Sequence, residues 1–526
     1  MKKTIVPTFF CLFCFLLTGI SVGISAETEH NSGKPGYAIV VSETTGSRAD
    51  WAQVVSALKQ KWDDQYQVQT FYWKSDLTET LESLQSFRPR YICFVARPEE
   101  SVRAFVVTVH QMTRQIDDDP YTDAIWGILT GFEAQDAERI VGAPALTVSR
   151  AAGGTSIPLE LFESGIWYDE GVQGHFVEKK PGQKPQERND GPADTTCALV
   201  QAIDSAQLVV SSGHATERDW QLGYAYRNGY LTCKNGNLFG VTTRRETVPV
   251  ESKQSKVWLA SGNCLIGHVR DLDCMALAMI HSANVDTMVG YTVPTWFGYM
   301  GWGILDYYLE QPGRFTAAEA FFANNQALTW NLEQRVPGLS AAINQPPTKP
   351  KSDTSEPGSA NAEPGSESAK ESEPISESLK QRLQEQLKQN GQFLRGLIFD
   401  QNVVALYGDP AWQNALAKQE SGWEQKLEFD FDRTNGDTVW TLTITPQKGE
   451  KSFSVINGNG SERNGRPIFA FLPRRIDVST IKIESGAALQ PTITDDFILV
   501  PQTESLKNSS SAVLRFSAKA QDNGAR

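Results

Sequence analysis

From Tyr37 onwards, short apolar runs alternate with longer amphipathic segments, and few architectures accommodate such an alternation. The run "YAIVV" (37–41) predicts a buried strand, and the segment that follows it carries apolar residues at helical spacing. Strands separated by helices of this length join through right-handed crossovers into a mostly parallel sheet with helices on both faces. The sequence therefore predicts an α/β fold.

The same periodicity returns along the chain as far as the phrase "VALYGDPAW". Further strands are predicted at "QVQTFYW" (67–73), "RYICFVA" (90–96), "TDAIWGILTG" (122–131), "LVVSS" (208–212), "KVWLA" (256–260) and "DTMVGY" (286–291). Residues 150–194 interrupt the pattern because they are rich in Gly, Pro and charge, and they are interpreted as a long loop excursion. Thr316 with Glu319 three residues on predicts a capping box at the start of a later helix.

The composition changes twice in the last third of the chain. Residues 346–378 are rich in Pro, Ser, Glu and Gly and nearly lack large apolar residues. Burial cannot offset the entropy of ordering such a segment, so it is predicted to be disordered. Residues 425–446 alternate apolar and charged side chains around Asn435-Gly436, which indicates a β-hairpin. Short strands continue to the end, so residues 424–526 predict a small β-sandwich.

The N-terminus has the features of an export signal. Two lysines precede the apolar run "FFCLFCFLLTGISV", and the small residues of "GISAE" predict cleavage after Ala26, so residues 1–26 are interpreted as a signal peptide. An uncleaved membrane anchor is the alternative, although the apolar run is short for a span. The mature chain is expected in the periplasm, at the cell surface or outside the cell, with no membrane segment once the signal is removed.

Charge and cysteine content narrow the class of protein further. A formal net charge of −13 leaves no basic excess to neutralise phosphates, which argues against a nucleic-acid partner. Five cysteines follow the signal, an odd number without disulfide-framework or zinc-ligand spacing, so an unpaired thiol needs another role. A structural calcium ion is compatible with the many carboxylates, but no EF-hand-type loop predicts one, and no cofactor or metal is required.

Two of the predicted strands end on side chains that carry chemistry. "LVVSSGH" ends on His214, and "KVWLASGNC" ends on Cys264, fifty residues later. Functional groups of a parallel α/β sheet collect beyond the carboxyl ends of its strands, so these two side chains meet if their strands are neighbours. A thiolate beside an imidazole is a strong nucleophile, and the backbone N–H groups of Ala215 and Cys264 could hold an oxyanion.

Each of these residues also has a structural explanation. A single His in a loop is more often a surface residue, and a single Cys is more often packed in the core. His268 is a rival base for Cys264, because residues i and i+4 of a helix face the same way. The apolar run before Cys264 favours a strand end over a helix at this position.

Four phrases surround the His and Cys strand ends in a characteristic order. They are "YTDAIWGILTGFEAQDAERI" (121–140), "VGYTVPTW" (289–296), "RFTAAEAFFANNQAL" (314–328) and "VALYGDPAW" (404–412). In this order the chain resembles the gingipain family of cysteine peptidases, within the caspase–legumain–gingipain superfamily. The resemblance covers about residues 37–412. It implies a caspase-like catalytic domain over 37–416 and an immunoglobulin-like domain over 424–526.

The resemblance also implies roles for particular residues. His214 is the general acid and base, Cys264 is the nucleophile, and Asp123 stands where the family often has an acidic residue that orients the His. A solvated carboxylate at the end of a strand is an equal explanation for Asp123. The pocket for the residue before the cleaved bond is lined, in the family, at the positions of Tyr291, Thr292 and Trp296. Core packing is an equal explanation for an aromatic side chain there.

The chain departs from the family pattern at both catalytic positions. "GHAT" stands where His-Gly is usual, so Ala215 lacks the freedom of glycine at positive φ, and "GNC" replaces the more usual Ala-Cys or Ser-Cys. The leading hypothesis is an exported cysteine endopeptidase that cleaves proteins or peptides through an acyl-enzyme. A catalytically silent binding or surface-assembly module is the rival, and a transpeptidase would use the same residues. Neither the residue preference nor the oligomeric state follows from the sequence.

Overall fold

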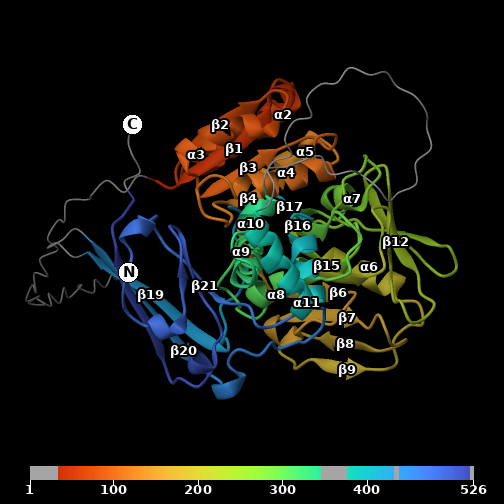
Figure 1. The fold of residues 1–526 in the computed structure, drawn as a ribbon. Helices are drawn as coiled ribbons and strands as arrows, with labels where there is room; N and C mark the ends of the chain where they lie inside the picture. Colours follow the sequence, from red (N-terminus) through yellow and green to blue (C-terminus); the bar gives the residue numbers. More distant parts are fainter. Residues whose placement is uncertain (1–33, 345–375, 432–436, 522–526) are drawn as a thin grey trace, which may run out of the picture.

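One large twelve-stranded sheet runs through the computed structural model, which describes residues 34–344, 376–431 and 437–521 (Figure 1). In spatial order its strands are β2 (Gln67–Trp73), β1 (Gly36–Ser42), β3 (Tyr91–Val95), β4 (Ile125–Leu129), β17 (Val404–Tyr407), β16 (Val285–Tyr291), β15 (Lys256–Asn263), β10 (Leu208–Gly213), β6 (Arg150–Gly153), β7 (Ser164–Tyr168), β8 (Phe176–Lys179) and β9 (Gln186–Arg188).

Most neighbouring strands of this sheet are parallel. The antiparallel pairs are β16–β17, β7–β8 and β8–β9. Strands β1, β3, β4, β15 and β16 are buried along almost their whole length, which is why they read as continuous apolar runs. The predicted α/β class with a mostly parallel sheet is confirmed, and so are the strands predicted from these runs.

Helices cover this sheet between the strands. Their bounds are α1 (Glu43–Gly46), α2 (Ala49–Trp62), α3 (Leu81–Phe87), α4 (Arg103–Thr113), α5 (Ala134–Gly142), α6 (Thr196–Ser205), α7 (Met275–His281), α8 (Tyr299–Tyr308), α9 (Ala317–Arg335), α10 (Leu339–Ile343) and α11 (Glu377–Asp400). Helices α8 and α9 lie over the middle of the sheet, in contact with β15 and β4 respectively (Figure 1). The predicted capping box is present, with reciprocal hydrogen bonds between Thr316 and Glu319.

Residues 150–194 are not the loop excursion that their composition suggests. They contribute β6 to β9, which extend the large sheet on the far side of β10. These strands are short and mostly half-buried or exposed, so they lack the continuous apolar signal of a central strand. Strands β6 and β7 are parallel to β10, so their ends lie at the same edge of the sheet as the end of β10.

Two smaller sheets lie within the same part of the chain. One is antiparallel and contains β11 (Asp219–Gln221), β12 (Tyr230–Lys234), β13 (Asn237–Val241) and β14 (Thr247–Pro249). The other pairs β5 (Leu146–Val148) with β18 (Asn414–Leu416), just beyond the "GDP" phrase. In that phrase the buried Asp409 accepts hydrogen bonds from Tyr37 (2.8 Å) and Trp62 (3.0 Å) and pairs with Lys61, so it holds the fold together.

The C-terminal part forms two antiparallel sheets. One contains β19 (Trp423–Phe431), β20 (Thr438–Pro446), β25 (Ala512–Ala518) and β22 (Lys482–Ser485), and the other β21 (Ile468–Phe471), β24 (Phe497–Val500) and β23 (Thr492–Ile493). The short helix α12 (Glu504–Lys507) precedes β25. The predicted hairpin is confirmed as the β19–β20 pair, whose turn lies outside the described residues. An immunoglobulin-like arrangement stays a prediction.

The two parts of the chain pack together through aromatic side chains. Phe469 of β21 and Phe497 of β24 lie with their ring centroids 6.0 and 6.2 Å from that of Phe322 on α9. Both phenylalanines belong to the same buried cluster as the core of the large sheet, whereas Trp440 and its neighbours form a second cluster. The C-terminal sheets are therefore joined to the main body by shared core.

Some expectations fall on parts of the chain that the structure does not describe. The predicted signal peptide, residues 1–26, lies outside the described residues, as does most of the tract 346–378. The last residues of that tract differ from the prediction, because Ser376 caps α11 by accepting a hydrogen bond from the N–H of Leu379. Of the helices in the described ranges, none has both the length and the apolar content needed to cross a membrane.

Candidate active site

The predicted meeting of His214 and Cys264 depends on the order of two strands, and the structure makes those strands neighbours. Strands β10 and β15 are parallel, and Gly213 is the register partner of Asn263. His214 directly follows the last residue of β10, and Cys264 directly follows the last residue of β15. Both residues therefore lie at the same edge of the sheet. Register partners in adjacent strands lie about 5 Å apart, so the two residues leave the sheet side by side.

Asn263, the unusual residue before the cysteine, ties the two strand ends together. Its buried side-chain amide donates to the carbonyl oxygen of Gly213 (3.1 Å) and accepts from the hydroxyl of Ser211 (2.6 Å). The Ser211 hydroxyl in turn accepts a hydrogen bond from the indole N–H of Trp258 (2.9 Å). The departure "GNC" thus has a structural reason: it fixes the exit of β10 relative to the exit of β15.

Cys264 is a free, half-buried thiol in a constrained turn. The backbone N–H of Thr295 donates to its sulfur (N···Sγ 3.3 Å), and the thiol also lies 3.7 Å from the carbonyl oxygen of Thr295. The next residue, Leu265, has φ +59°, a left-handed conformation that is uncommon for a branched side chain. Strained backbone of this kind is concentrated at functional sites.

His214 is exposed and is placed by the glycine before it. Gly213 has φ +100°, which a residue with a Cβ rarely adopts, and the chain turns there out of β10. The ring of Tyr224 lies roughly perpendicular to the imidazole, with 6.5 Å between the ring centroids.

Two backbone N–H groups at this edge are available to a ligand. Within the described residues, no hydrogen bond engages the N–H of Ala215 or that of Cys264. The groups around Ala215 are paired, since the N–H of Gln221 donates to the carbonyl of His214 (2.9 Å). Unengaged donors beside a nucleophile are the elements of an oxyanion hole.

An acidic residue absent from the sequence expectations, Glu170, lies beside Gly213, the residue before His214. It follows the end of β7, and its Oε2 is 3.3 Å from the position that a Cβ on Gly213 would occupy. The hydroxyl of Thr155, after the end of β6, donates to its Oε1 (3.2 Å). Burial raises the pKa of Glu170 to about 7, and the Thr155 hydroxyl opposes that shift.

Glu170 was missed because its segment was interpreted as a loop. The phrase "GIWYDEG" (165–171) does carry a signal, since it is a short apolar run that ends on an acidic pair and a glycine. It has the same form as "LVVSSGH", a strand that ends on a functional group. Four parallel strand ends, of β7, β6, β10 and β15, therefore contribute Glu170, Thr155, His214 and Cys264 to one edge.

Asp123 does not orient His214 in the structure. It precedes β4, and β17, β16 and β15 separate β4 from β10, which puts the two strands about 19 Å apart. Its Oδ2 accepts from the backbone N–H groups of Ile116 (3.0 Å) and Asp117 (3.1 Å). Burial and the nearby carboxylates raise the pKa of Asp123 well above its usual value, which favours the neutral form. The structure therefore does not bring Asp123 to His214.

The neighbourhood of Asp123 is where a cation could bind. Asp117, Asp119 and Asp123 have carboxylate oxygens within 4.8 Å of one another. Positive charge is already close, because Arg88 lies 3.8 Å from Asp117 and Arg475 donates to the carbonyl of Asp123 (2.7 Å). A structural calcium ion stays a prediction.

Of the three predicted pocket residues, only Trp296 is open to solvent. The hydroxyl of the buried Tyr291 donates to Asp400 (3.0 Å), and that of Thr292 donates to the carbonyl of Val403 (2.9 Å). Both side chains are therefore part of the core and do not line an open pocket. Trp296 is 52% exposed and directly follows Thr295, whose backbone contacts the sulfur of Cys264.

The rival base, His268, loses its geometric support. Cys264 lies in a turn after β15, and the next helix, α7, begins only at Met275. The i and i+4 relation on a helix therefore does not apply to Cys264 and His268.

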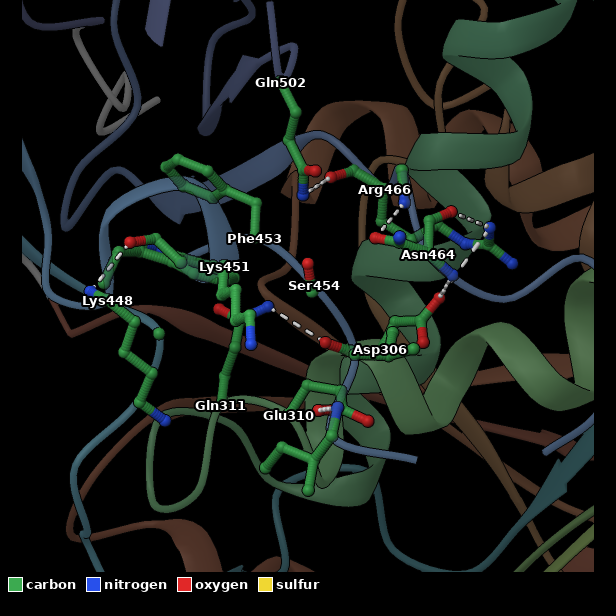
Figure 2. A pocket seen from close by; sticks show the side chains of 16 residues that line it. Asp306, Glu310, Gln311, Lys448, Lys451, Phe453, Ser454, Asn464, Arg466 and Gln502 are labelled. Carbon is green, nitrogen blue, oxygen red and sulfur yellow. Dashed lines mark hydrogen bonds and ion pairs between the residues drawn. The ribbon is translucent and has the colours of Figure 1, made fainter. Parts of the chain in front are cut away.

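A separate pocket of about 280 Å³ lies between α8 and the C-terminal sheets (Figure 2). Asp306 and Glu310 on one side and Lys448 and Lys451 on the other contribute to its wall, as Figure 2 shows. Neither His214 nor Cys264 lines it. This pocket is therefore separate from the sheet edge that carries His214 and Cys264.

Comparisons with known proteins do not identify the function of this chain. No protein-family model matches the chain, and no curated protein sequence matches it. A solved chain described as "Structure of Protease" has a TM-score of 0.39 and 7% sequence identity, over 78% of this chain and 85% of that chain. A likeness at this level carries no conclusion about fold or activity.

Proposed function

We propose that the protein is a gingipain-like cysteine endopeptidase that cleaves peptide bonds through an acyl-enzyme. The observation that carries the proposal is the register of β10 and β15, which brings His214 and Cys264 out of the sheet side by side. Peptide substrates, export and a caspase-like catalytic domain over residues 37–416 belong to the same proposal.

In the proposed reaction, the Cys264 thiolate attacks the carbonyl carbon of the scissile peptide. The N–H groups of Ala215 and Cys264 donate to the oxyanion that forms, and His214 protonates the leaving amine. Water, deprotonated by the same imidazole, then attacks the thioester and releases the acid product with the free thiol. In this proposal the Glu170 carboxylate, which lies next to Gly213, stabilises the charged imidazole through space.

Labelling of the thiol tests the proposal against a catalytically silent module. A peptidyl acyloxymethyl ketone is expected to alkylate the folded protein at Cys264, and the label is read by mass spectrometry after digestion. Labelling should vanish in Cys264→Ala and fall in His214→Ala. Cys197→Ala is the matched control, because Cys197 is the free cysteine that is exposed in the structure. Equal labelling of Cys197 and Cys264 would favour the silent module.

A transpeptidase uses the same residues and differs only in the acceptor of the acyl group. Adding a primary amine, such as glycine amide, to the cleavage reaction separates the two. A hydrolase releases the free acid in its presence, whereas a transpeptidase forms the amide product in proportion to the added amine.

The pKa of Glu170 predicts how cleavage depends on pH. The carboxyl is neutral below its pKa of about 7 and charged above it, and only the charged form stabilises the His214 imidazolium. We therefore expect kcat to rise as the pH increases through about 7. Glu170→Gln should remove this limb and lower kcat at pH 8 by about 10- to 100-fold. The exposed Glu160 provides the control Glu160→Gln, and a limb that persists in Glu170→Gln excludes Glu170 as its source.

The preference for the residue before the cleaved bond is also a proposal. Recognition of a basic residue needs an available carboxylate, but Glu217 is paired with Arg270 (2.8 Å) and Asp271 with Arg218 (2.6 Å). Trp296 next to Thr295 supplies a large apolar surface instead. We expect a peptide-library profile to favour apolar over basic residues, and cleavage confined to Arg or Lys would contradict this.

A further inference from the structure

The segment 455–466 leaves the C-terminal sheets and reaches the catalytic edge of the large sheet; we call it the bridging loop. The amide of Asn457 donates to the hydroxyl of Ser156 (2.8 Å), and the amide of Asn459 donates to the hydroxyl of Thr155. We propose that Asn459 is a positioning residue for the catalytic pair, acting through Thr155 and Glu170. This inference rests on the peptidase function proposed above.

The direction of the Thr155 hydroxyl proton links Asn459 to Glu170. The Asn459 side-chain nitrogen also lies 3.4 Å from the carbonyl oxygen of Ser156, which can only accept, so this end of the amide is the donor. A threonine hydroxyl has a single proton. Because Asn459 donates to Thr155 Oγ1, that proton is left for the carboxylate of Glu170, 3.2 Å away. Asn459 therefore sets the hydrogen bond that favours charged Glu170.

The bridging loop also packs beneath the exit of the cysteine strand. Gly460, at φ +97°, lies directly against the indole of Trp302, and a Cβ there would overlap the ring. The same indole lies beside Gly262, two residues before Cys264, where a Cβ would be 2.6 Å from the ring. One loop thus contacts the supports of both the His214 and the Cys264 strand ends.

Buried charges hold the bridging loop in this position. Arg463 donates to Asp306 and to Glu310 (2.8 Å) on and just after α8, and its own side chain and both carboxylates are at most 7% exposed. The backbone N–H groups of Ile456 and Asn464 donate to Glu310 (2.6 Å) and Asp306 (2.9 Å). Figure 2 shows these two carboxylates facing the C-terminal segment. The loop that carries Asn459 is anchored at both ends.

It follows that the C-terminal part supplies a component of the catalytic site. Thr155 and Asn459 are more than three hundred residues apart in sequence, and their contact forms only when the C-terminal sheets are docked. A chain in which this docking fails is expected to keep His214 and Cys264 adjacent. It should lose the contact from Asn459 that directs the Thr155 hydroxyl proton to the Glu170 carboxylate.

Two substitutions at Asn459 test the positioning role on the full-length protein. Asn459→Asp replaces the donor with acceptor oxygens that compete for the Thr155 proton and adds negative charge near Glu170. We expect the ascending limb of the kcat–pH profile to move up by about one pH unit. Asn459→Ala should lower kcat at pH 7 about fivefold with KM little changed. Asn508→Ala is the control, because Asn508 is an exposed asparagine elsewhere in the C-terminal part.

A thermal unfolding curve separates positioning from mere stability. A structural role would lower the Tm of the Asn459 variants and leave the limb where it is in the wild type, which overturns the proposal. If Asn459 acts through Thr155, the variants Thr155→Val and Thr155→Val/Asn459→Ala have the same kcat. A double variant whose loss of kcat is the product of the two single losses would overturn the positioning role.

The failure of this inference can be told from failure of the peptidase proposal. The rate at which iodoacetamide alkylates Cys264 needs no peptide substrate, and its pH profile is measured on the same variants. A wild type that alkylates but never cleaves peptides refutes the peptidase function alone, and the profile of Asn459→Asp then still decides the positioning role. Identical alkylation profiles in wild type and Asn459→Asp overturn that role.

Discussion

Replacement of Cys264 by Ala is expected to lower kcat for peptide cleavage by about 10⁴-fold or more, because it removes the proposed nucleophile. His214→Ala should lower kcat by about 10²- to 10⁴-fold, the range for loss of a general acid–base group. The double variant should be no worse than Cys264→Ala, since both residues serve one covalent step. Steady-state cleavage of a fluorogenic peptide at pH 8 measures all three.

His268→Ala is the control that this expectation needs. Because Cys264 lies in a turn and not in a helix with His268, the variant should retain kcat within about twofold of the wild type. A loss comparable to that of His214→Ala would assign the base to His268 instead. Retention of cleavage by Cys264→Ala would remove the proposed mechanism altogether.

Replacement of Arg463 by Met is expected to lower the free energy of unfolding by about 3–5 kcal/mol, because it leaves Glu310 buried without its cation and Asp306 with only the longer pair to Arg466 (3.8 Å). Burial already raises the pKa of Glu310 to about 7, so the measurement belongs at pH 8, where this carboxyl is charged. Urea denaturation followed by tryptophan fluorescence gives the free energy. The loss of cleavage should exceed that of Asn459→Ala, since Arg463 also donates to the carbonyl of Asn459 (3.1 Å).

An exposed ion pair in the same molecule provides the comparison. Arg188 and Asp190 form a 2.6 Å pair in which the side chains are 47% and 65% exposed. Arg188→Met should leave the urea midpoint close to that of the wild type, because solvent screens such pairs. If Arg463→Met is equally mild, the bridging loop is not anchored by these charges.

Much of the large sheet could be predicted from the sequence because its central strands are buried on both faces. Runs such as "YAIVV" and "YICFV" are apolar throughout, and no other element of that length fits them. The segment 150–194 was misjudged for the opposite reason. Strands β7 to β9 lie at the end of the sheet and are half-buried or exposed, so their side chains carry little periodic signal.

The positions of the proposed nucleophile and base could be predicted from the sequence, but that of the proposed carboxylate, Glu170, could not. His214 and Cys264 each end a clear apolar run, and their order along the chain matched a known pattern. Asp123 stands before an apolar run rather than after one, and the sequence does not show how far that strand lies from the strand of His214. The strand order shows this distance, because three strands separate β4 from β10 whereas β6 and β7 follow directly on the other side.

Local periodicity was sufficient to show which residues stand at strand ends, since burial of a strand is recorded in its own side chains. The sideways order of the strands is recorded nowhere locally, because it results from packing among segments that are hundreds of residues apart. That order places Glu170, and not Asp123, near the ends of β10 and β15, and docking of the C-terminal sheets brings Asn459 to Thr155. The sequence therefore shows which reactive side chains stand at strand ends. Only the packed core shows which of them lie close to one another.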